Sequence, residues 1–194
     1  MRLGVRTRVR RAVRAVAKID DWVSAALTLP IGQISLGEAR ALGALVSSLE
    51  GPGPIVEIGT LFGWSTRVMV LFKAPERELV TVDSYVWNPL SLPQERHERA
   101  TGEALDEAVQ NYHVRRVNQD KAAFYASYTG PAPALVFLDA IHSYEETRKD
   151  IEWARSVQAK TICLHDYSPT HPGVMRAVDE AGGPRQLFES LAVL

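Results

Sequence analysis

A turn rich in glycine carries the first residues whose types and spacing could do chemistry. Glu57 ends a short apolar run, and Gly59 and Gly63 follow it with G-x-x-x-G spacing. Ser65 and Thr66 then begin the next predicted helix. Glycines allow a tight turn and a close backbone approach to a ligand, and free N–H groups at a helix start attract a carboxylate or a phosphate. The pattern therefore indicates a small-molecule site, without the third glycine of the dinucleotide-binding fingerprint.

Acidic residues follow two further apolar runs. Asp83 lies 26 residues after Glu57, where a carboxylate can accept hydrogen bonds from both hydroxyls of a ribose. It could instead serve as a turn or capping residue. Asp120 follows the third run, where it could contact an adenine amino group or cap the helix predicted at 121–128. Together with the glycine turn, the two acids favour a ligand that contains a nucleoside.

Short apolar runs and amphipathic stretches alternate regularly along the chain. Strands buried on both faces are expected at 55–59, 79–83, 114–119, 134–139 and 161–166. Helices are expected between them at 64–73, 94–112, 121–128 and 144–157, and before them at 20–29 and 36–49. Ser35 and Glu38 form a capping box for the last of these. The alternation predicts an α/β fold with a mostly parallel sheet, helices on both faces and ligands beyond the carboxyl ends of the strands.

The connection at 84–93 is long for a compact α/β domain and contains two prolines. Long ordered loops of this kind often form binding walls. Its aromatic residues, Tyr85 and Trp87, either line a ligand pocket or pack on a neighbouring helix.

Three stretches, in this order along the chain, resemble one enzyme family. They are the glycine turn from Glu57 to Thr66 with Asp83, then Leu138-Asp139-Ala-Ile-His142-Ser-Tyr-Glu145, then His165-Asp166-Tyr followed by Pro172-Gly173 and Asp179-Glu180. Over roughly residues 52–180 the chain resembles class I S-adenosylmethionine-dependent methyltransferases. Within them it is similar to the subgroup of macrocin-type O-methyltransferases and cephalosporin-hydroxylase-like proteins. The resemblance implies a Rossmann-like, doubly wound sheet of order 3-2-1-4-5 plus a C-terminal strand, after an N-terminal helical extension.

The resemblance also implies S-adenosylmethionine as the cofactor. Glu57, Gly59 and Gly63 would surround its methionine end, Asp83 would hold the ribose, and Asp120 would lie near the adenine. The full set of residues expected to contact the cofactor is Glu57, Gly59, Thr60, Gly63, Ser65, Thr66, Asp83, Asp120 and Asp139.

The ends of the fourth and fifth strands supply a candidate metal site. In the implied order these strands are neighbours, so Asp139 and the pair His165-Asp166 project into one crevice. Acids at these ends bind a divalent ion in the resembling family, which makes Asp139, His165 and Asp166 the expected ligands of Mg²⁺, or of Mn²⁺ given the histidine. Structural roles also account for each residue singly. Ser143 begins a capping box just after His142, and His165 could be a satisfied core histidine.

These residues predict metal-assisted O-methylation of a small hydroxylated molecule such as a sugar, a phenol or a natural product. Some relatives have a second acid two residues after the first, and Ile141 occupies that position here. Either His142 therefore acts as the base beside Asp139, or the chemistry differs. The rivals are a protein that binds S-adenosylmethionine or a nucleotide without methylating, and a nicotinamide-dependent dehydrogenase.

Composition excludes several other classes. The chain has 194 residues, 46% hydrophobic and 23% charged, and no apolar stretch approaches the ~18 residues of a membrane span. The single cysteine, Cys163, excludes an intramolecular disulfide framework and is compatible with the reducing cytoplasm, where we expect the protein. Residues 1–18 hold seven basic residues and no acid, so residues 19–194 carry 15 basic against 23 acidic residues. This acidic balance opposes nucleic-acid binding.

Both ends of the chain lie outside the regular alternation. Val5, Val9, Val13 and Val16 recur at helical spacing among the arginines, which favours a helix or arm lying on the domain or on a second subunit over a membrane anchor, a nucleic-acid arm or a transit segment. Residues 1–50 are expected to form an extension packed on a domain of residues 51–194. The last ten residues can make one strand or two very short ones, and the open sheet edge predicts a homodimer.

Overall fold

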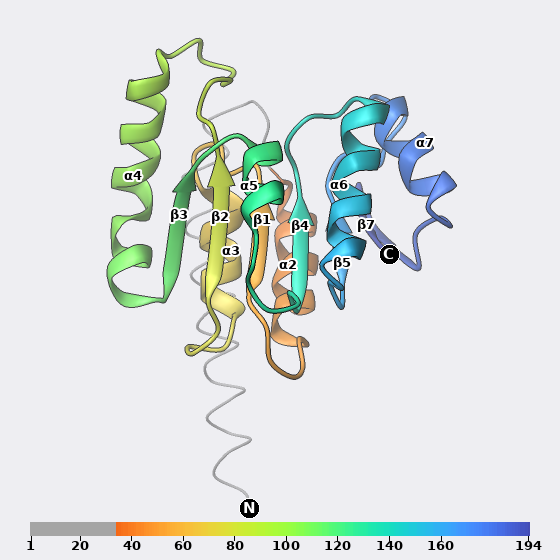
Figure 1. Cartoon of the computed structure of the whole chain (residues 1–194), viewed down its shortest axis with the longest axis horizontal. Coiled ribbons are helices and arrows are strands. Elements are labelled where there is room, and N and C mark those ends of the chain that lie inside the picture. Colours follow the sequence, from red (N-terminus) through yellow and green to blue (C-terminus); the bar gives the residue numbers. More distant parts are fainter. Residues whose placement is uncertain (1–33) are drawn as a thin grey trace, which may run out of the picture.

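A computed structural model describes residues 34–194, which form one sheet covered by helices on both faces (Figure 1). The sheet order is β3-β2-β1-β4-β5-β7-β6. The strands are β1 (Ile55–Ile58), β2 (Leu79–Asp83), β3 (Val114–Asn118), β4 (Leu135–Leu138), β5 (Ile162–Leu164), β6 (Gln186–Phe188) and β7 (Leu191–Val193). The helices are α2 (Leu36–Ser47), α3 (Trp64–Phe72), α4 (Gln94–Asn111), α5 (Lys121–Ser127), α6 (Tyr144–Ser156) and α7 (Pro172–Glu180).

Strands β1 to β5 pair in parallel, whereas β7 runs antiparallel to both β5 and β6. The expected Rossmann-like α/β fold and the order 3-2-1-4-5 are thereby confirmed. The chain ends in two short antiparallel strands, the second of the two alternatives left open for its last ten residues. Parallel pairing places the carboxyl ends of β1 to β5 on one edge of the sheet, at the top of Figure 1.

Alternate residues of the inner strands contribute to two cores. In β1, Val56 and Ile58 pack beneath α5, α6 and α7, while Ile55 packs beneath α2, α3 and α4. Strands β1, β4 and β5 are buried on both faces, as expected. The expectation was wrong for β3, where only Val114 is fully buried, because β3 is an edge strand.

Element boundaries mostly follow the sequence pattern, with one helix missed. Helix α2 begins with the expected capping box, in which Ser35 accepts a hydrogen bond from the amide of Glu38. Helix α7 was not anticipated, because the Pro172-Gly173 pair suggests a break. Proline is favoured in the first helical turn, where its missing N–H costs no internal hydrogen bond. The predicted helix at 20–29 and the basic stretch at 3–18 lie outside the described residues.

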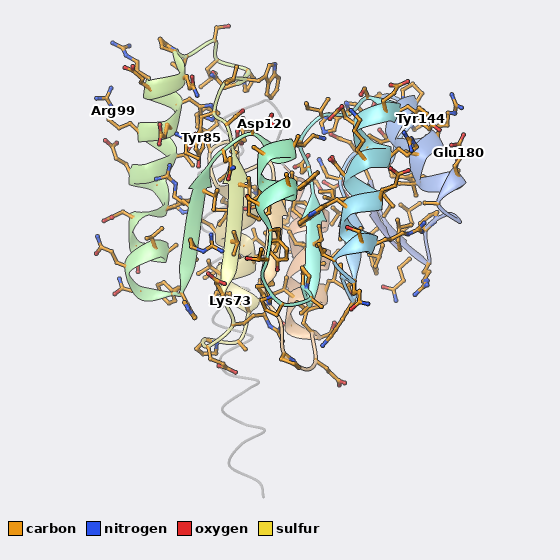
Figure 2. All side chains as sticks on the ribbon, in the orientation of Figure 1. Lys73, Tyr85, Arg99, Asp120, Tyr144 and Glu180 are labelled. Carbon is orange, nitrogen blue, oxygen red and sulfur yellow. The ribbon has the colours of Figure 1, made fainter. Side chains whose placement is uncertain are left out.

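The 84–93 connection lies between β2 and α4, and its two aromatic residues have different environments. Tyr85 is fully buried and contacts the ring of His97 edge-on, whereas Trp87 is 68% exposed. Figure 2 shows Tyr85 and Asp120 near the carboxyl ends of the strands and Lys73 at the opposite end. No helix within residues 34–194 is long and apolar enough to cross a membrane.

Candidate active site

A cavity of about 460 Å³ opens at the carboxyl ends of the parallel strands. Its volume lies within the range of ~300–1,000 Å³ that is common for small-molecule sites. The residues that line the cavity follow the order of the strands in the sheet. They are Gln119, Asp120 and Lys121 after β3, Asp83 at the end of β2, Gly59, Thr60 and Ser65 after β1, Asp139, Ile141 and His142 after β4, and Asp166 after β5. The order reverses at β1 and β4, so the cavity lies at the switch point where open α/β sheets bind ligands.

The glycine turn requires both of its glycines. Gly59 has φ of 99°, and a Cβ there would lie 2.0 Å from the carbonyl oxygen of Asp139. Gly63 caps α3 with φ of 81°, and a Cβ there would meet Leu105 at 2.8 Å. Only glycine therefore allows the β1 turn to lie against the β4 loop. Gly59 lines the cavity, whereas Gly63 lies behind its wall.

Glu57 lies beneath the turn and is fully buried. Its carboxylate accepts hydrogen bonds from Ser65 Oγ at 2.5 Å, Thr66 Oγ1 at 2.5 Å and Thr81 Oγ1 at 2.6 Å. Burial raises the pKa of Glu57 to about 7, although the three hydroxyls oppose this rise. Neither Glu57 nor Thr66 lines the cavity. In this structure both side chains hold the turn from behind, and their expected contact with the cofactor stays a prediction.

Asp83 joins the glycine turn to the 84–93 loop. Its Oδ2 accepts hydrogen bonds from the amides of Thr60 at 2.9 Å and Leu61 at 2.8 Å, and its Oδ1 accepts from the amide of Tyr85 at 2.7 Å. A carboxylate has about four acceptor positions, so Asp83 retains capacity for a ligand hydroxyl.

Asp120 has the capping role that its sequence position allowed, and it lies where the predicted contact with an adenine is possible. Its side chain caps α5 by accepting a hydrogen bond from the amide of Ala122 at 2.8 Å, and it also lines the cavity. The next residue, Lys121, extends away to a buried ion pair with Asp150 of α6 at 2.6 Å. This pair anchors the start of α5, and with it Asp120, to the neighbouring helix.

Asp139, His165 and Asp166 gather at the ends of β4 and β5, as expected. Nδ1 of His165 lies 3.3 Å from Oδ1 of Asp139 and 3.4 Å from Oδ2 of Asp166. On its other side, Nε2 of His165 lies 3.3 Å from Oε2 of Glu38. His165 does not line the cavity itself, whereas the two aspartates do.

The charges of this group reinforce one another. Burial lowers the pKa of His165, but hydrogen bonds to Asp139, Asp166 and Glu38 outweigh it and raise the value to about 12. Burial raises the pKa of Asp139, but hydrogen bonds from His142 and His165 lower it to about 2. The neighbouring carboxylates therefore favour the protonated form of His165.

The donor set fits a divalent ion. Two carboxylates and one imidazole suit Mn²⁺ and also offer Mg²⁺ its preferred oxygen ligands. Nδ1 of His165 could bind an ion after losing its proton, while Nε2–H continues to donate to Glu38. A carboxylate on the far nitrogen is the usual partner of a metal-bound histidine. Glu38 was expected only as part of the capping box, and its sequence position gives no signal of this contact 127 residues away.

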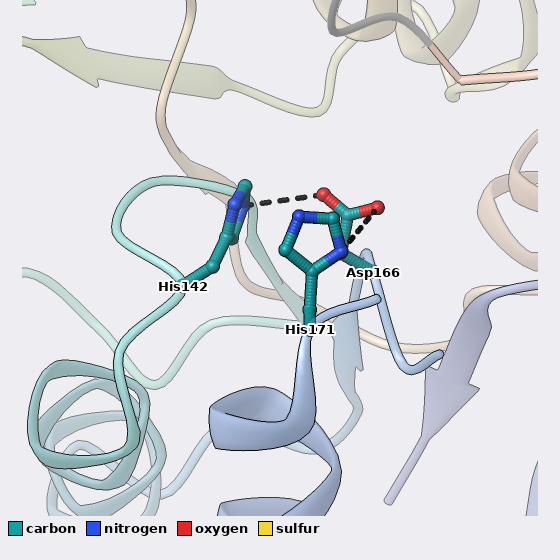
Figure 3. A group of neighbouring side chains, drawn as sticks. All are labelled: His142, Asp166 and His171. Atoms are coloured by element: carbon teal, nitrogen blue, oxygen red, sulfur yellow. Dashed lines mark ion pairs between the residues drawn. The ribbon is translucent and has the colours of Figure 1, made fainter. Parts of the chain in front are cut away.

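Two more histidines lie beside the group. Nε2 of His142 lies 3.4 Å from Oδ1 of Asp139 and 3.4 Å from Oδ2 of Asp166. The hydrogen bond to Asp139 raises the pKa of His142, against the opposing effect of burial. His171 was not anticipated, and its Nδ1 lies 3.4 Å from Oδ1 of Asp166 (Figure 3). Its only sequence signal is a position six residues after His165 and directly before Pro172.

Comparison with known proteins agrees with this geometry. Residues 56–167, more than half of the chain, match a family described as methyltransferase domain. The chain belongs to this methyltransferase family. The match confirms the expected enzyme class, an S-adenosylmethionine-dependent methyltransferase, and gives no support to a nicotinamide-dependent dehydrogenase. No match was found among curated proteins.

Solved structures share the fold. The cofactor-bound Rv0187 from MTB is 21% identical, with a TM-score of 0.66 over 93% of this chain and 88% of that one. An O-methyltransferase from Bacillus cereus in complex with SAH is 18% identical, with a TM-score of 0.63 and the same coverage. The O-methyltransferase TomG from Streptomyces achromogenes, involved in tomaymycin synthesis and solved with SAM, is 22% identical, with a TM-score of 0.59 over 87% and 78%.

Proposed function

We propose that this methyltransferase transfers a methyl group from S-adenosylmethionine to a hydroxyl of a small molecule, assisted by Mg²⁺ or Mn²⁺. The observation that carries the proposal is the continuity of one cavity, which runs from the glycine turn and Asp83 to Asp139, His142 and Asp166. Two of the similar structures are described as O-methyltransferases, with SAH or SAM bound. This supports the choice of oxygen as the acceptor atom.

The cofactor end of the cavity is the half formed after β1, β2 and β3. Gly59 and Thr60 offer a close backbone surface to the methionine portion, and Asp83 has acceptor capacity for ribose hydroxyls. Asp120 lies beyond Asp83 in sheet order, which suits an adenine amino group. S-adenosylmethionine supplies a methyl group already activated by its sulfonium, so alignment of the two reactants should provide much of the acceleration.

The acceptor end is the half formed after β4 and β5. His142 lines the cavity and is the residue we propose as the base, with Asp139 orienting its ring through the contact at Nε2. Asp139, His165 and Asp166 would hold the divalent ion. When bound, the ion would lower the pKa of the acceptor hydroxyl and so assist its deprotonation.

Part of the cavity rim, in the loops after β2 and β4, is apolar. Val86, Trp87 and Ile141 all line the cavity and are at least half exposed. Such a rim favours an acceptor that carries an aromatic or apolar face beside its hydroxyl, such as a phenol or a glycosylated natural product. Membership of the macrocin-type subgroup belongs to the same proposal, supported by the grouping of Asp139, His142 and Asp166.

The proposal is tested by measuring cofactor binding and methyl transfer separately. Calorimetry should detect binding of S-adenosylmethionine, and labelled cofactor should transfer its methyl group to members of a panel of phenols and sugars. Asp139→Asn and Asp166→Asn should each lower turnover by about 100-fold or more, since each removes a charged ligand of the ion. Asp106→Asn, an exposed change on α4, is the matched control.

Two results would contradict the proposal. Absence of binding at millimolar S-adenosylmethionine would remove the cofactor assignment. Undiminished turnover of both variants in the presence of a chelator would remove the ion. Cofactor binding without transfer to any acceptor would instead favour the non-methylating alternative.

A further inference from the structure

Three side chains from separate segments converge beside the candidate catalytic group. His142 comes from the β4–α6 loop, Asp166 follows β5, and His171 caps α7, and one ligand atom of each lies within 4.8 Å of the others. Nε2 of His142 is 3.4 Å from Oδ2 of Asp166, and Nδ1 of His171 is 3.4 Å from its Oδ1. Figure 3 shows both rings directed towards this one carboxylate.

These separations leave room for an ion. A direct N–H···O hydrogen bond is usually ~2.9 Å long. A tetrahedral ion with bonds of ~2.1 Å holds its donor atoms about 3.4 Å apart. Each nitrogen faces a different oxygen of Asp166 at 3.4 Å, a separation longer than a usual hydrogen bond and similar to that between two ligand atoms of one ion.

We propose that His142, Asp166 and His171 bind a first-row transition-metal ion, with Zn²⁺ as the best fit. Two neutral imidazoles and one carboxylate are ligands that Zn²⁺, Fe²⁺ and Co²⁺ accept, whereas Mg²⁺ takes mainly oxygen. The three side chains are 33%, 20% and 33% exposed. An ion can therefore enter from solvent and keep water in its open positions.

The backbone holds the two later ligands in place. Asp166 has φ of 61°, a left-handed conformation that is uncommon outside glycine. The carbonyl of Asp166 accepts from the amide of Ser168 at 2.8 Å, and the carbonyl of Ser168 accepts from the amide of His171 at 2.9 Å. These hydrogen bonds turn the segment between β5 and α7 back on itself, so His171 lies beside Asp166.

This site differs from the proposed catalytic ion site, with which it shares only Asp166. It has one consequence that rests on the proposed function. A nitrogen bound to an ion cannot accept a proton, so an ion on His142 would prevent this residue from acting as the base. We therefore expect Zn²⁺ to inhibit methyl transfer, with less inhibition when His171 is replaced.

The first measurement titrates Zn²⁺ into the chelator-treated full chain, without cofactor or acceptor. The second adds Co²⁺ in place of Zn²⁺ and records its visible absorption. His171→Asn removes the imidazole and places a residue favoured at the start of a helix, where His171 makes no capping hydrogen bond with its side chain. His142→Gln removes the other imidazole without touching α7. His113→Asn is the matched control, since His113 is exposed and lies at the opposite end of the sheet.

We expect His171→Asn and His142→Gln each to weaken Zn²⁺ binding by about 10- to 100-fold and to reduce the Co²⁺ absorption. His113→Asn should bind Zn²⁺ within about twofold of wild type. Wild-type affinity in either imidazole variant, an equal loss in His113→Asn, or no wild-type binding below millimolar Zn²⁺ would overturn the proposal. Since cofactor and acceptor are absent, none of these results depends on methyl transfer.

Discussion

The behaviour of Glu57 follows from opposing effects on one buried carboxyl group. Burial favours the neutral form, while three hydroxyl donors favour the ionised form, and the net result is a pKa of about 7 against the ordinary 4.5. Below pH 4.5 the group is protonated in both the folded and unfolded chain. Above pH 7 it is ionised in both, and the folded state then carries the cost of the buried charge.

We predict that ionisation of Glu57 lowers the free energy of unfolding as pH rises from 5 to 8. The full effect is about 3 kcal/mol, and most of it falls within this pH range. Glu57→Gln should remove this dependence, since a glutamine does not ionise. Urea unfolding at pH 5, 6, 7 and 8 measures the effect, with the exposed Glu103→Gln as the control. If wild type and Glu57→Gln show parallel profiles of unfolding free energy against pH, the buried ionisation is absent.

At the scale of elements, shared hydrogen bonds connect the turn after β1 to the turn after β2 at the cofactor end of the cavity. Asp83 binds amides of both turns, and the buried ring of His97 from α4 contacts the carbonyl of Tyr85 at 3.1 Å and that of Leu61 at 2.9 Å. Leu61 and Tyr85 have positive φ values of 49° and 57°. Conformations this uncommon persist because neighbouring contacts determine them.

His97→Leu should therefore weaken both the fold and cofactor binding. Loss of the buried contacts between the imidazole of His97 and the two carbonyls is expected to cost about 1–3 kcal/mol of unfolding free energy. The loosened turns should raise the Kd for S-adenosylmethionine about tenfold, equivalent to ~1.4 kcal/mol. Thermal unfolding and calorimetry measure the two effects, with His113→Asn as the surface control. Unchanged cofactor affinity would show that His97 has no role in ordering the turns.

The 84–93 loop should affect the acceptor more than the cofactor. Trp87 lines the cavity while remaining largely exposed, whereas Leu90 of the same loop is exposed and does not line it. Trp87→Ala should raise the acceptor KM about tenfold by removing an aromatic contact worth ~1 kcal/mol or more, with little change in the Kd for the cofactor. Leu90→Ala should change neither value. An unchanged acceptor KM in Trp87→Ala would exclude this rim from acceptor binding.

At the scale of the whole molecule, the sequence predicts what depends on local pattern and on parallel pairing. Strand ends of a parallel sheet meet at one edge, so the grouping of Asp83, Asp139 and Asp166 followed from the alternation of elements. The sequence could not predict that the side chain of Glu57 points away from the cavity. This orientation depends on hydroxyl groups that α3 and β2 donate to its carboxylate.

Long-range contacts account for the remaining surprises. The contact of Glu38 with His165 joins α2 to the end of β5, and no local pattern encodes it. The sequence did not predict His171 as a site residue because it did not predict α7. The start of this short helix lies beside Asp166, whose own backbone has a left-handed conformation. Sequence pattern therefore located the site, while tertiary packing decided which side chains complete it.

Within residues 34–194 the sheet ends at β6, where Leu187 and Phe188 are exposed. Unpaired strand edges can accept another strand, so we predict that a second copy of the chain pairs there. Sedimentation at micromolar concentration should show a dimer, and Phe188→Lys should shift it to a monomer, whereas Val109→Lys on α4 should not. A monomeric wild type would contradict this prediction.

The central claim, one cavity with cofactor and ion at adjoining strand ends, is tested most directly by a crystal structure with SAH and Mn²⁺. We predict SAH against the turn from Gly59 to Gly63, with its adenine near Asp120. An anomalous Mn²⁺ peak should lie among Asp139, His165 and Asp166. SAH bound elsewhere, or no Mn²⁺ peak between these three side chains, would contradict the account.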